Sequence, residues 1–216
     1  MKGMNLVPGK ISLAGLCLLA GTIVIYPALS AGERPHLSSI LASSQQIRTA
    51  PAGAHRPVVL EGTVTVPPGV FITGPGDFQI QDDSGGLFIT SKQIYPAKLW
   101  HFVRVSGDLS IEDGEIQLNL SSFQDLTGDN GIKEVIPRQI SVADAVHGTY
   151  SEQLVSVRGK AVNINIADER DEVWVESPSG EIIQTYWNHE PKRPTILKDI
   201  SLGSEVEVSG ISVPVL

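Results

Sequence analysis

Acidic side chains gather at points of the sequence where carboxylate oxygens could hold a cation. Asp82 and Asp83 precede Ser84, while Asp125, Asp129 and Asn130 form a second group. Calcium binds carboxylate and backbone oxygens. The same residue types favour tight turns for backbone reasons alone, and no glutamate follows where it would complete an EF-hand. We therefore interpret both groups as turns, with a calcium site as the alternative at Asp82 and Asp83.

Residues suited to zinc binding or nucleophilic catalysis are present without a recognised pattern. Histidines occur at His36, His55, His101, His147 and His189, and no two have zinc-ligand spacing. Ser84 precedes glycines but lacks the Gly-x-Ser-x-Gly elbow of hydrolases. The charged run Asp168–Asp171 is expected to be a solvated turn between strands. The sequence predicts no zinc site or hydrolytic triad and leaves any metal requirement open.

Aromatic residues are the better candidates for ligand binding. Rings on neighbouring strands of a small β-barrel can stack on sugars or bases. The candidate ligand-binding residues are Phe78, Phe88, Trp174, Tyr186 and Trp187. Packing in the core or between domains is the alternative for each, because aromatic side chains dominate burial energetics. Trp187 lies near Asn188, His189 and Lys192-Arg193, and we expect an exposed recognition loop there.

The composition favours short strands joined by turns and counts against a nucleic-acid partner. The 216 residues include 21 Gly and 14 Pro, which suit turns better than long helices. Lysine and arginine total 16 against 24 acidic residues, for a net charge of -8. An acidic surface repels phosphate backbones, so binding to nucleic acid is not expected to be the main role.

The N-terminus predicts export. Lys2 and Lys10 precede an uncharged run from Ile11 to Tyr26, and small residues follow up to Ala31. This order is typical of a cleaved secretory signal, which predicts a periplasmic or extracellular protein. An uncleaved membrane anchor is the alternative, because a membrane span needs roughly 20 residues. After cleavage the chain would have lost Cys17 and could form no disulfide.

Alternation of polar and apolar residues predicts strands. Phe78–Ile89 forms two alternating runs around an Asp-Asp-Ser-Gly turn, which predicts a β-hairpin with Phe78 and Ile80 on one face. Further strands are expected near 57–66, 100–108 and 115–120, with sharp bends at Gly62 and Gly107. Five strands in this order fit an OB-fold, a small five-stranded Greek-key barrel.

The pattern recurs in the second half of the chain. Leu154–Val162, Val173–Ile183 and Glu205–Gly210 repeat the first strand, the hairpin and the fourth strand. The remaining residues are too few for a complete fifth strand, so we expect that strand to lie outside this chain or to come from a partner. Short helices are expected near Ser38 and over Ile140–Val146, the latter capped by Ser141.

The predicted fold class is all-β, with two tandem OB-like five-stranded barrels, the second incomplete, and a short helix before each. The predicted boundaries are 1–31 for the signal or anchor, 32–54 for a leader with a helix, 55–124 for the first domain, 125–150 for a linker with a helix, and 151–216 for the second domain.

Four stretches carry a resemblance to a known family. They are Arg56–Thr65, Phe78–Ile89, Val103–Gly107 and Ile140–Gly159. They resemble the exported tandem OB-fold-like domains of bacterial proteins that are often N-terminal to membrane sensor kinases, and the likeness extends over Leu37–Gly210. The resemblance implies the fold and a place in a signalling system, and it implies nothing about a ligand.

The sequence thus predicts an exported, non-enzymatic binding or scaffold module, with a sensory input region as its more specific form. No cofactor is expected, the ligand or protein partner is unknown, and membrane contact is expected only through an uncleaved N-terminus. One alternative is a metal-dependent hydrolase or an enzyme accessory domain. The other is single-stranded nucleic-acid binding by analogy with other OB-folds.

Overall fold

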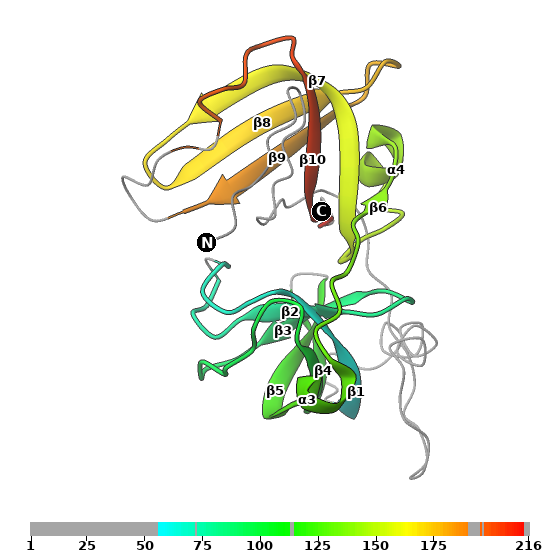
Figure 1. The fold of residues 1–216 in the computed structure, drawn as a ribbon, viewed down its shortest axis with the longest axis vertical. Coiled ribbons are helices and arrows are strands. Elements are labelled where there is room, and N and C mark those ends of the chain that lie inside the picture. Colours follow the sequence, from blue (N-terminus) through cyan, green and yellow to red (C-terminus); the bar gives the residue numbers. More distant parts are fainter. Residues whose placement is uncertain (1–55, 72, 113–114, 190–194, 196, 214–216) are drawn as a thin grey trace. The chain divides into compact units, whose positions relative to one another are not determined.

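The computed structural model describes residues 56–71, 73–112, 115–189, 195 and 197–213 (Figure 1). The predicted signal or anchor, the helix near Ser38 and Lys192-Arg193 lie outside these residues. The chain divides into two compact units. The first unit contains the described residues up to Ile136 together with Glu152–Leu154, and the second contains Pro137–Ser151 and those from Val155 onward.

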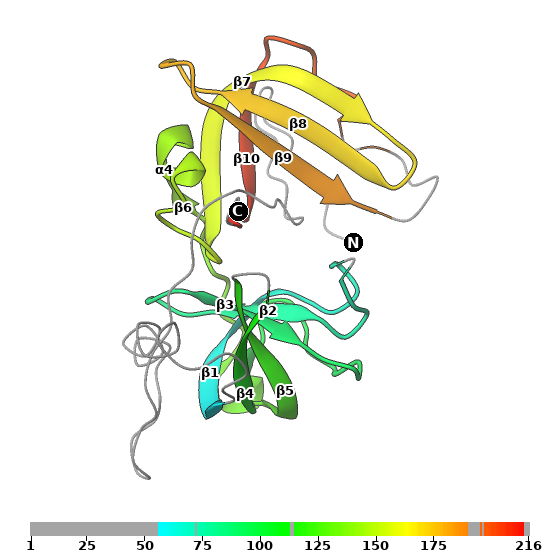
Figure 2. The same ribbon diagram turned by 180° about the vertical axis from the view of Figure 1, so that it is seen from behind.

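The first unit is a closed five-stranded barrel. Its strands are β1 (Arg56–Val66), β2 (Phe78–Gln81), β3 (Gly86–Thr90), β4 (Phe102–Glu112) and β5 (Glu115–Asp125), and α3 (Thr127–Asn130) follows. The strands pair in the order β1-β2-β3-β5-β4, with β3 parallel to β5 and the other pairs antiparallel. In Figure 2 the long strands β1, β4 and β5 curve around the barrel. This is the topology of an OB-fold, as the sequence predicts.

The hairpin of β2 and β3 separates the core of the barrel from its outer surface. Phe78 pairs with Ile89 and Ile80 with Leu87, and all four side chains are buried. Gln79 and Phe88 pair on the opposite face. In the turn, the amide and hydroxyl of Ser84 donate to Asp82 Oδ1 over 2.7 and 2.6 Å. The Asp82 carboxylate therefore shapes the reversal, in agreement with the turn interpretation.

Two irregularities bend the barrel strands. The pairing of β4 with β5 shifts between Ser106 and Gly107, where a Cβ on the glycine would lie 2.0 Å from the Asn119 carbonyl oxygen. The predicted bend at Gly107 is thus confirmed as a β-bulge. At Gly62, where the sequence also predicts a bend, pairing with Val103 is regular, and the register shift in β1 lies between Val64 and Val66.

The second unit is an open sheet. Its elements are β6 (Arg138–Gln139), α4 (Val142–Val146), β7 (Leu154–Ile166), β8 (Arg170–Glu176), β9 (Ile182–Asn188) and β10 (Glu205–Ile211). The order is β10-β7-β8-β9, with β6 beside β7, and β7 bends strongly along its length (Figures 1 and 2). This order matches β4-β1-β2-β3 of the first barrel. Among the described residues of this unit, no strand corresponds to β5.

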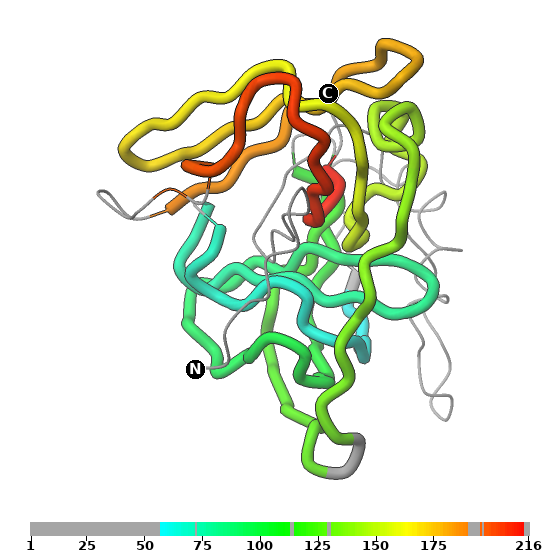
Figure 3. Tube along the Cα trace, turned by 45° about the horizontal axis from the view of Figure 1, so that its top comes forward, coloured from blue at the N-terminus to red at the C-terminus, as the bar shows by residue number. Residues whose placement is uncertain are grey.

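Local contacts in the second unit confirm two predicted features. The Ser141 hydroxyl accepts from the Asp144 amide over 2.9 Å and completes a capping box at the start of α4. The turn between β8 and β9, orange in Figure 3, closes with the Ser177 amide donating to the Glu181 carbonyl over 2.8 Å. No helix in the described part of the chain is long and apolar enough to span a membrane.

Candidate ligand-binding groove

A groove of about 690 Å³ lies on the outer side of the first barrel, along β3 and β5. Two loops, the one between β1 and β2 and the one after β3, complete its walls. The residues that line it are Thr73, Gly74, Asp77, Phe88, Thr90, Ser91, Lys92, Gln93, Tyr95, Glu112, Glu115, Gln117, Asn119, Leu120 and Ser121. A groove of this volume suits a small molecule or a short oligomer.

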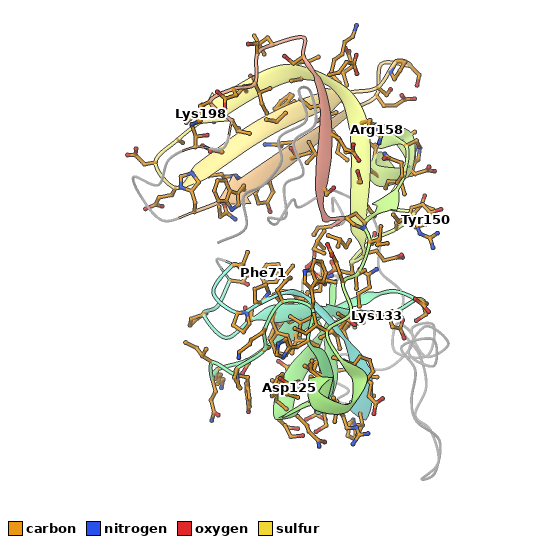
Figure 4. All side chains as sticks on the ribbon, in the orientation of Figure 1. Phe71, Asp125, Lys133, Tyr150, Arg158 and Lys198 are labelled. Atoms are coloured by element: carbon orange, nitrogen blue, oxygen red, sulfur yellow. The ribbon has the colours of Figure 1, made fainter. Side chains whose placement is uncertain are left out.

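Two aromatic rings contribute to the wall, and each is held by a second ring. Phe88 points outward from β3 because its neighbours Leu87 and Ile89 point into the core. Phe71, labelled in Figure 4, meets Phe88 edge to face with 4.8 Å between ring centroids. Tyr95 packs on Phe123 at 5.5 Å. The rings therefore offer an apolar surface whose orientation is set before a ligand arrives.

Side-chain amides lie along β5, between its apolar core residues. Asn119 accepts from the Thr90 hydroxyl over 3.0 Å and donates to the Ser110 hydroxyl over 2.6 Å. Gln117 donates to the Glu112 carboxylate. These contacts fix each amide on one side and leave further donor and acceptor capacity for a ligand.

Asp77 ties together the two loops that wall the groove. Its carboxylate accepts from the Thr73 hydroxyl over 2.8 Å and from the Ser91 amide over 3.0 Å. A Cβ at Gly76 would lie 2.4 Å from the carbonyl oxygen of Gln93, so the loops approach each other as closely as only glycine permits. Asp77 is itself only 5% exposed and therefore shapes the groove.

The groove is acidic. Asp77, Glu112 and Glu115 contribute carboxylates, whereas Lys92 is the one cationic side chain among the described residues that line it. An arrangement of this kind disfavours phosphate and carboxylate ligands and favours uncharged or cationic ones.

A short segment of the chain, Glu152–Leu154, covers the outer face of β2 beside the groove. Gln79 Nε2 donates to the Glu152 carbonyl oxygen over 2.5 Å, and the Leu154 amide donates to Gln81 Oε1 over 2.7 Å. The Glu152 carbonyl also lies against Gly86, where a Cβ would approach it to 1.6 Å. Burial, reinforced by the nearby Glu115, raises the pKa of Glu152 to about 8.

The predicted aromatic residues fall at separate places. Phe78 has no exposed surface and packs in the barrel core, because the outward position of β2 falls on Gln79. Phe88 lines the groove. Trp174, 37% exposed, and Tyr186 lie on one face of the second sheet, with the Arg170 guanidinium 3.8 Å from the Tyr186 ring. The five residues therefore do not form one site.

Trp187 lies on the other face of the second sheet, among polar residues that include a buried carboxylate. Its ring lies 5.1 Å from that of His189. The His189 Nε2 atom is 3.4 Å from Asp171 Oδ1, and the Thr195 hydroxyl donates to Asp171 Oδ2 over 2.5 Å. The prediction that Asp168–Asp171 is a solvated turn is wrong for Asp171, which is 1% exposed because β8 begins at Arg170 and turns Asp171 inward.

Asp125, one of the residues considered for calcium, is engaged by neighbouring side chains. Hydrogen bonds from Thr127 and His101 lower the pKa of Asp125, labelled in Figure 4, to about 2. The His101 Nδ1 atom lies 2.7 Å from Asp125 Oδ2, and the Thr127 amide donates to Oδ1 over 2.9 Å. Among the residues that the structure describes, no three His, Cys, Asp or Glu side chains gather as metal ligands.

Sequence reasoning missed most of the groove. Gln117 and Asn119 alternate with Ile116 and Leu118, so their outward direction was open to prediction. The role of Asp77 and of the surrounding loops depends on contacts between distant segments, which no local pattern indicates.

Comparisons with known proteins leave the ligand unassigned. No protein-family model matches the sequence, and no curated protein matches it. The chain is similar to the solved hypothetical protein ygiW of E. coli at 11% identity, over 45% of this chain and 94% of that one, with a TM-score of 0.31.

Two further solved structures are similar at the same low level. One, described as the molecular basis for abrogation of activation of pro-inflammatory cytokines, has 12% identity over 74% of this chain and 93% of that one, with a TM-score of 0.34. The other is fission yeast Pot1 with ssDNA, at 14% identity over 76% of this chain and 70% of that one, with a TM-score of 0.25. Likenesses this weak carry no argument about the ligand of this chain.

Proposed function

We propose that this protein is an exported, non-enzymatic binding module whose first barrel holds a small polar ligand, uncharged or cationic, in the groove along β3 and β5. The observation that carries the proposal is the groove itself, where Phe88 and the amides of Gln117 and Asn119 are held by neighbouring side chains. Groups fixed before binding lose little conformational freedom when a ligand arrives.

The charge of the groove supports this ligand class over a nucleic acid. Single-stranded nucleic acids bind OB-folds through basic grooves with stacking rings. Here the acidic side chains Asp77, Glu112 and Glu115 outnumber Lys92. Phosphate groups would meet net repulsion in the groove.

Export and a place in signalling belong to the same proposal. Export is supported by the charged, apolar and small-residue order of residues 1–31. A sensory input role is supported by the resemblance to exported domains that precede sensor kinases. A ligand bound in the first barrel would then be the input.

The proposal is tested by NMR titration of the full chain with a panel of small uncharged, cationic and anionic compounds. Uncharged or cationic compounds are expected to shift the amide resonances of β3 and β5, and anionic ones are not. Phe88→Ala should weaken binding by about tenfold or more through loss of the ring contact. Trp174→Ala, which removes an exposed ring from the second sheet, should leave it unchanged.

Two outcomes would overturn the proposal. Shifts centred on Trp174 and Tyr186 instead of β3 and β5 would place the ligand on the second sheet. Turnover of a hydrolysable substrate that depends on added calcium or zinc would favour the metal-dependent hydrolase.

A further inference from the structure

Glu152 is a buried acid next to the groove. Its side chain is 4% exposed, and its backbone has a φ of 59°, which is uncommon for a residue other than glycine. Contacts on both sides hold this conformation, since Gln79 donates to its carbonyl and Gln81 accepts from the Leu154 amide. The backbone of Glu152 is thereby held against β2.

The register of the sheet places Glu115 beside this acid. Phe88 of β3 lies opposite Gln117 of β5 in a parallel pair, so Gly86, two residues earlier, is level with Glu115. The Glu152 carbonyl lies directly on Gly86. Glu115 also lines the groove and is paired across the hairpin with Glu112. One carboxylate thus lies next to both the groove and the buried acid.

In the part of the chain that the structure describes, the residues that contact the Glu152–Leu154 backbone are uncharged. β2 faces it with Gln79 and Gln81, β3 with Gly86, and β5 with Glu115. Within the described part of the chain, Glu115 is the titratable group that acts on it. The charge of Glu152 therefore depends chiefly on burial and, to a smaller extent, on the charge near Glu115.

We propose that the groove binds a cationic ligand and that its occupancy is linked, through Glu115, to a proton carried by Glu152. The inference rests on the proposed function and adds a ligand charge and a form of regulation to it. A positive charge beside Glu115 offsets the repulsion that adds to the effect of burial on Glu152, so binding favours release of the proton. By reciprocity, loss of the proton strengthens binding of the cation.

The affinity of the groove for a cation should depend on pH through the charge of Glu152. Glu152, with a pKa of about 8, is neutral below that pH and adds a negative charge near the groove above it. Affinity for a cation therefore rises as the pH passes through this value. For two charges separated by several ångströms near a protein surface, the gain is about fivefold.

The test uses choline, whose charge does not titrate, and its uncharged isostere 3,3-dimethyl-1-butanol. Each is titrated into the full chain at about pH 6.5 and about pH 9.5, on either side of the Glu152 pKa. The methyl resonances of Leu120, which lines the groove, report binding. Choline is expected to bind about fivefold more tightly at the higher pH, and the isostere is expected to bind more weakly and equally at both.

Two isosteric variants test the contributions of Glu152 and Glu115 separately. Glu152→Gln should abolish the pH dependence of choline binding without displacing choline from the groove. Glu115→Gln should weaken choline binding at both pH values and lower the Glu152 pKa, observed by carbon NMR of the side-chain carboxyl. A merely structural role for Glu115 would leave that pKa unmoved and would overturn the linkage.

The outcomes separate this inference from the proposed function. Equal choline affinity at both pH values would overturn the proton linkage alone. Equal binding of choline and its isostere would overturn the cationic ligand class. If choline leaves Leu120 unperturbed while an uncharged compound shifts it, the inference fails and the binding module stands. If no compound in the panel shifts the groove, both fail.

Discussion

The two units use one strand order and differ in how the sheet ends. In the first barrel, β5 pairs with both β3 and β4 and places Ile116 and Leu118 in the core. In the described residues of the second unit, β9 and β10 have no strand of this kind between them. The groove is lined by β5 and by the loops that meet it, so the strand that closes the barrel also builds the candidate site.

The outer faces of the two hairpins differ as well. In the first barrel, Gln79 and Gln81 are buried beneath Glu152–Leu154. In the second sheet, the matching position on β8 carries Trp174, which is 37% exposed. The same alternation of residues thus gives a covered polar face in one unit and an exposed aromatic one in the other.

The largest expected effect follows from shortening a core side chain of β5, the strand that closes the first barrel. Leu118→Ala removes a fully buried side chain and should destabilise the first barrel by about 2–5 kcal/mol. Hydrogen exchange followed by NMR measures each unit separately. Protection should fall in β3, β4 and β5 and persist in β8 and β9, whereas an equal loss in both units would show that they unfold together.

Glu152 should give the first barrel a stability that depends on pH. Because its pKa is raised from 4.5 to about 8, its contribution is complete below pH 4.5 and is lost as pH rises through about 8. The loss is on the order of a few kcal/mol. Glu152→Gln should remove this decline in denaturant unfolding, and a decline that persists in the variant would assign it to other groups.

Gly107→Ala tests the β-bulge between β4 and β5. In the described residues of the second sheet, β10 has no partner strand equivalent to β5 with which to form such a bulge. The new Cβ would meet the Asn119 carbonyl at 2.0 Å, and the shift needed to relieve the clash should cost about 1–3 kcal/mol. Gly128→Ala in α3 is the matched control, since nothing lies within 4 Å of its Cβ. Thermal unfolding compares them, and equal midpoints would mean that β4 and β5 adjust freely.

The smallest effect is expected in the second unit. Ser141→Ala removes the capping box of α4 and should cost about 1 kcal/mol. In the first unit, the N-cap residue of α3 is Leu126, which makes no side-chain cap, so no matching substitution removes a capping box there. Ser141→Asp should restore most of the stability, and a variant with alanine that unfolds like the parent would show that α4 is held by packing alone.

Much of the fold could be predicted because its determinants are local. Alternation along β2, β3 and β5 gave the strands and their inner faces, and repetition of the pattern gave the second unit. Ser141 was predictable as a cap because its partner is three residues away. The register shift in β1 lies between Val64 and Val66 and could not be located from Gly62, because the position of a bulge depends on the partner strand and not on glycine alone.

The site was less predictable because it depends on contacts between distant segments. Phe88 could be identified from its outward position on β3. Phe71 and Asp77 contact their partners through loop conformations that the sequence does not specify. Asp171 was expected in solvent because charged neighbours surround it, yet the strand turns its side chain inward beside His189.

The contacts of Gln79 and Gln81 bear on how the first barrel can be produced in isolation. Both amides find their partners in Glu152–Leu154, residues that lie beyond α4 in the sequence. A polypeptide ending at Ile136 would retain every barrel strand but would expose the two side-chain amides that Glu152–Leu154 covers in the full chain. Supplying Glu152–Leu154 as a separate peptide offers a way to rebuild the barrel surface from two pieces.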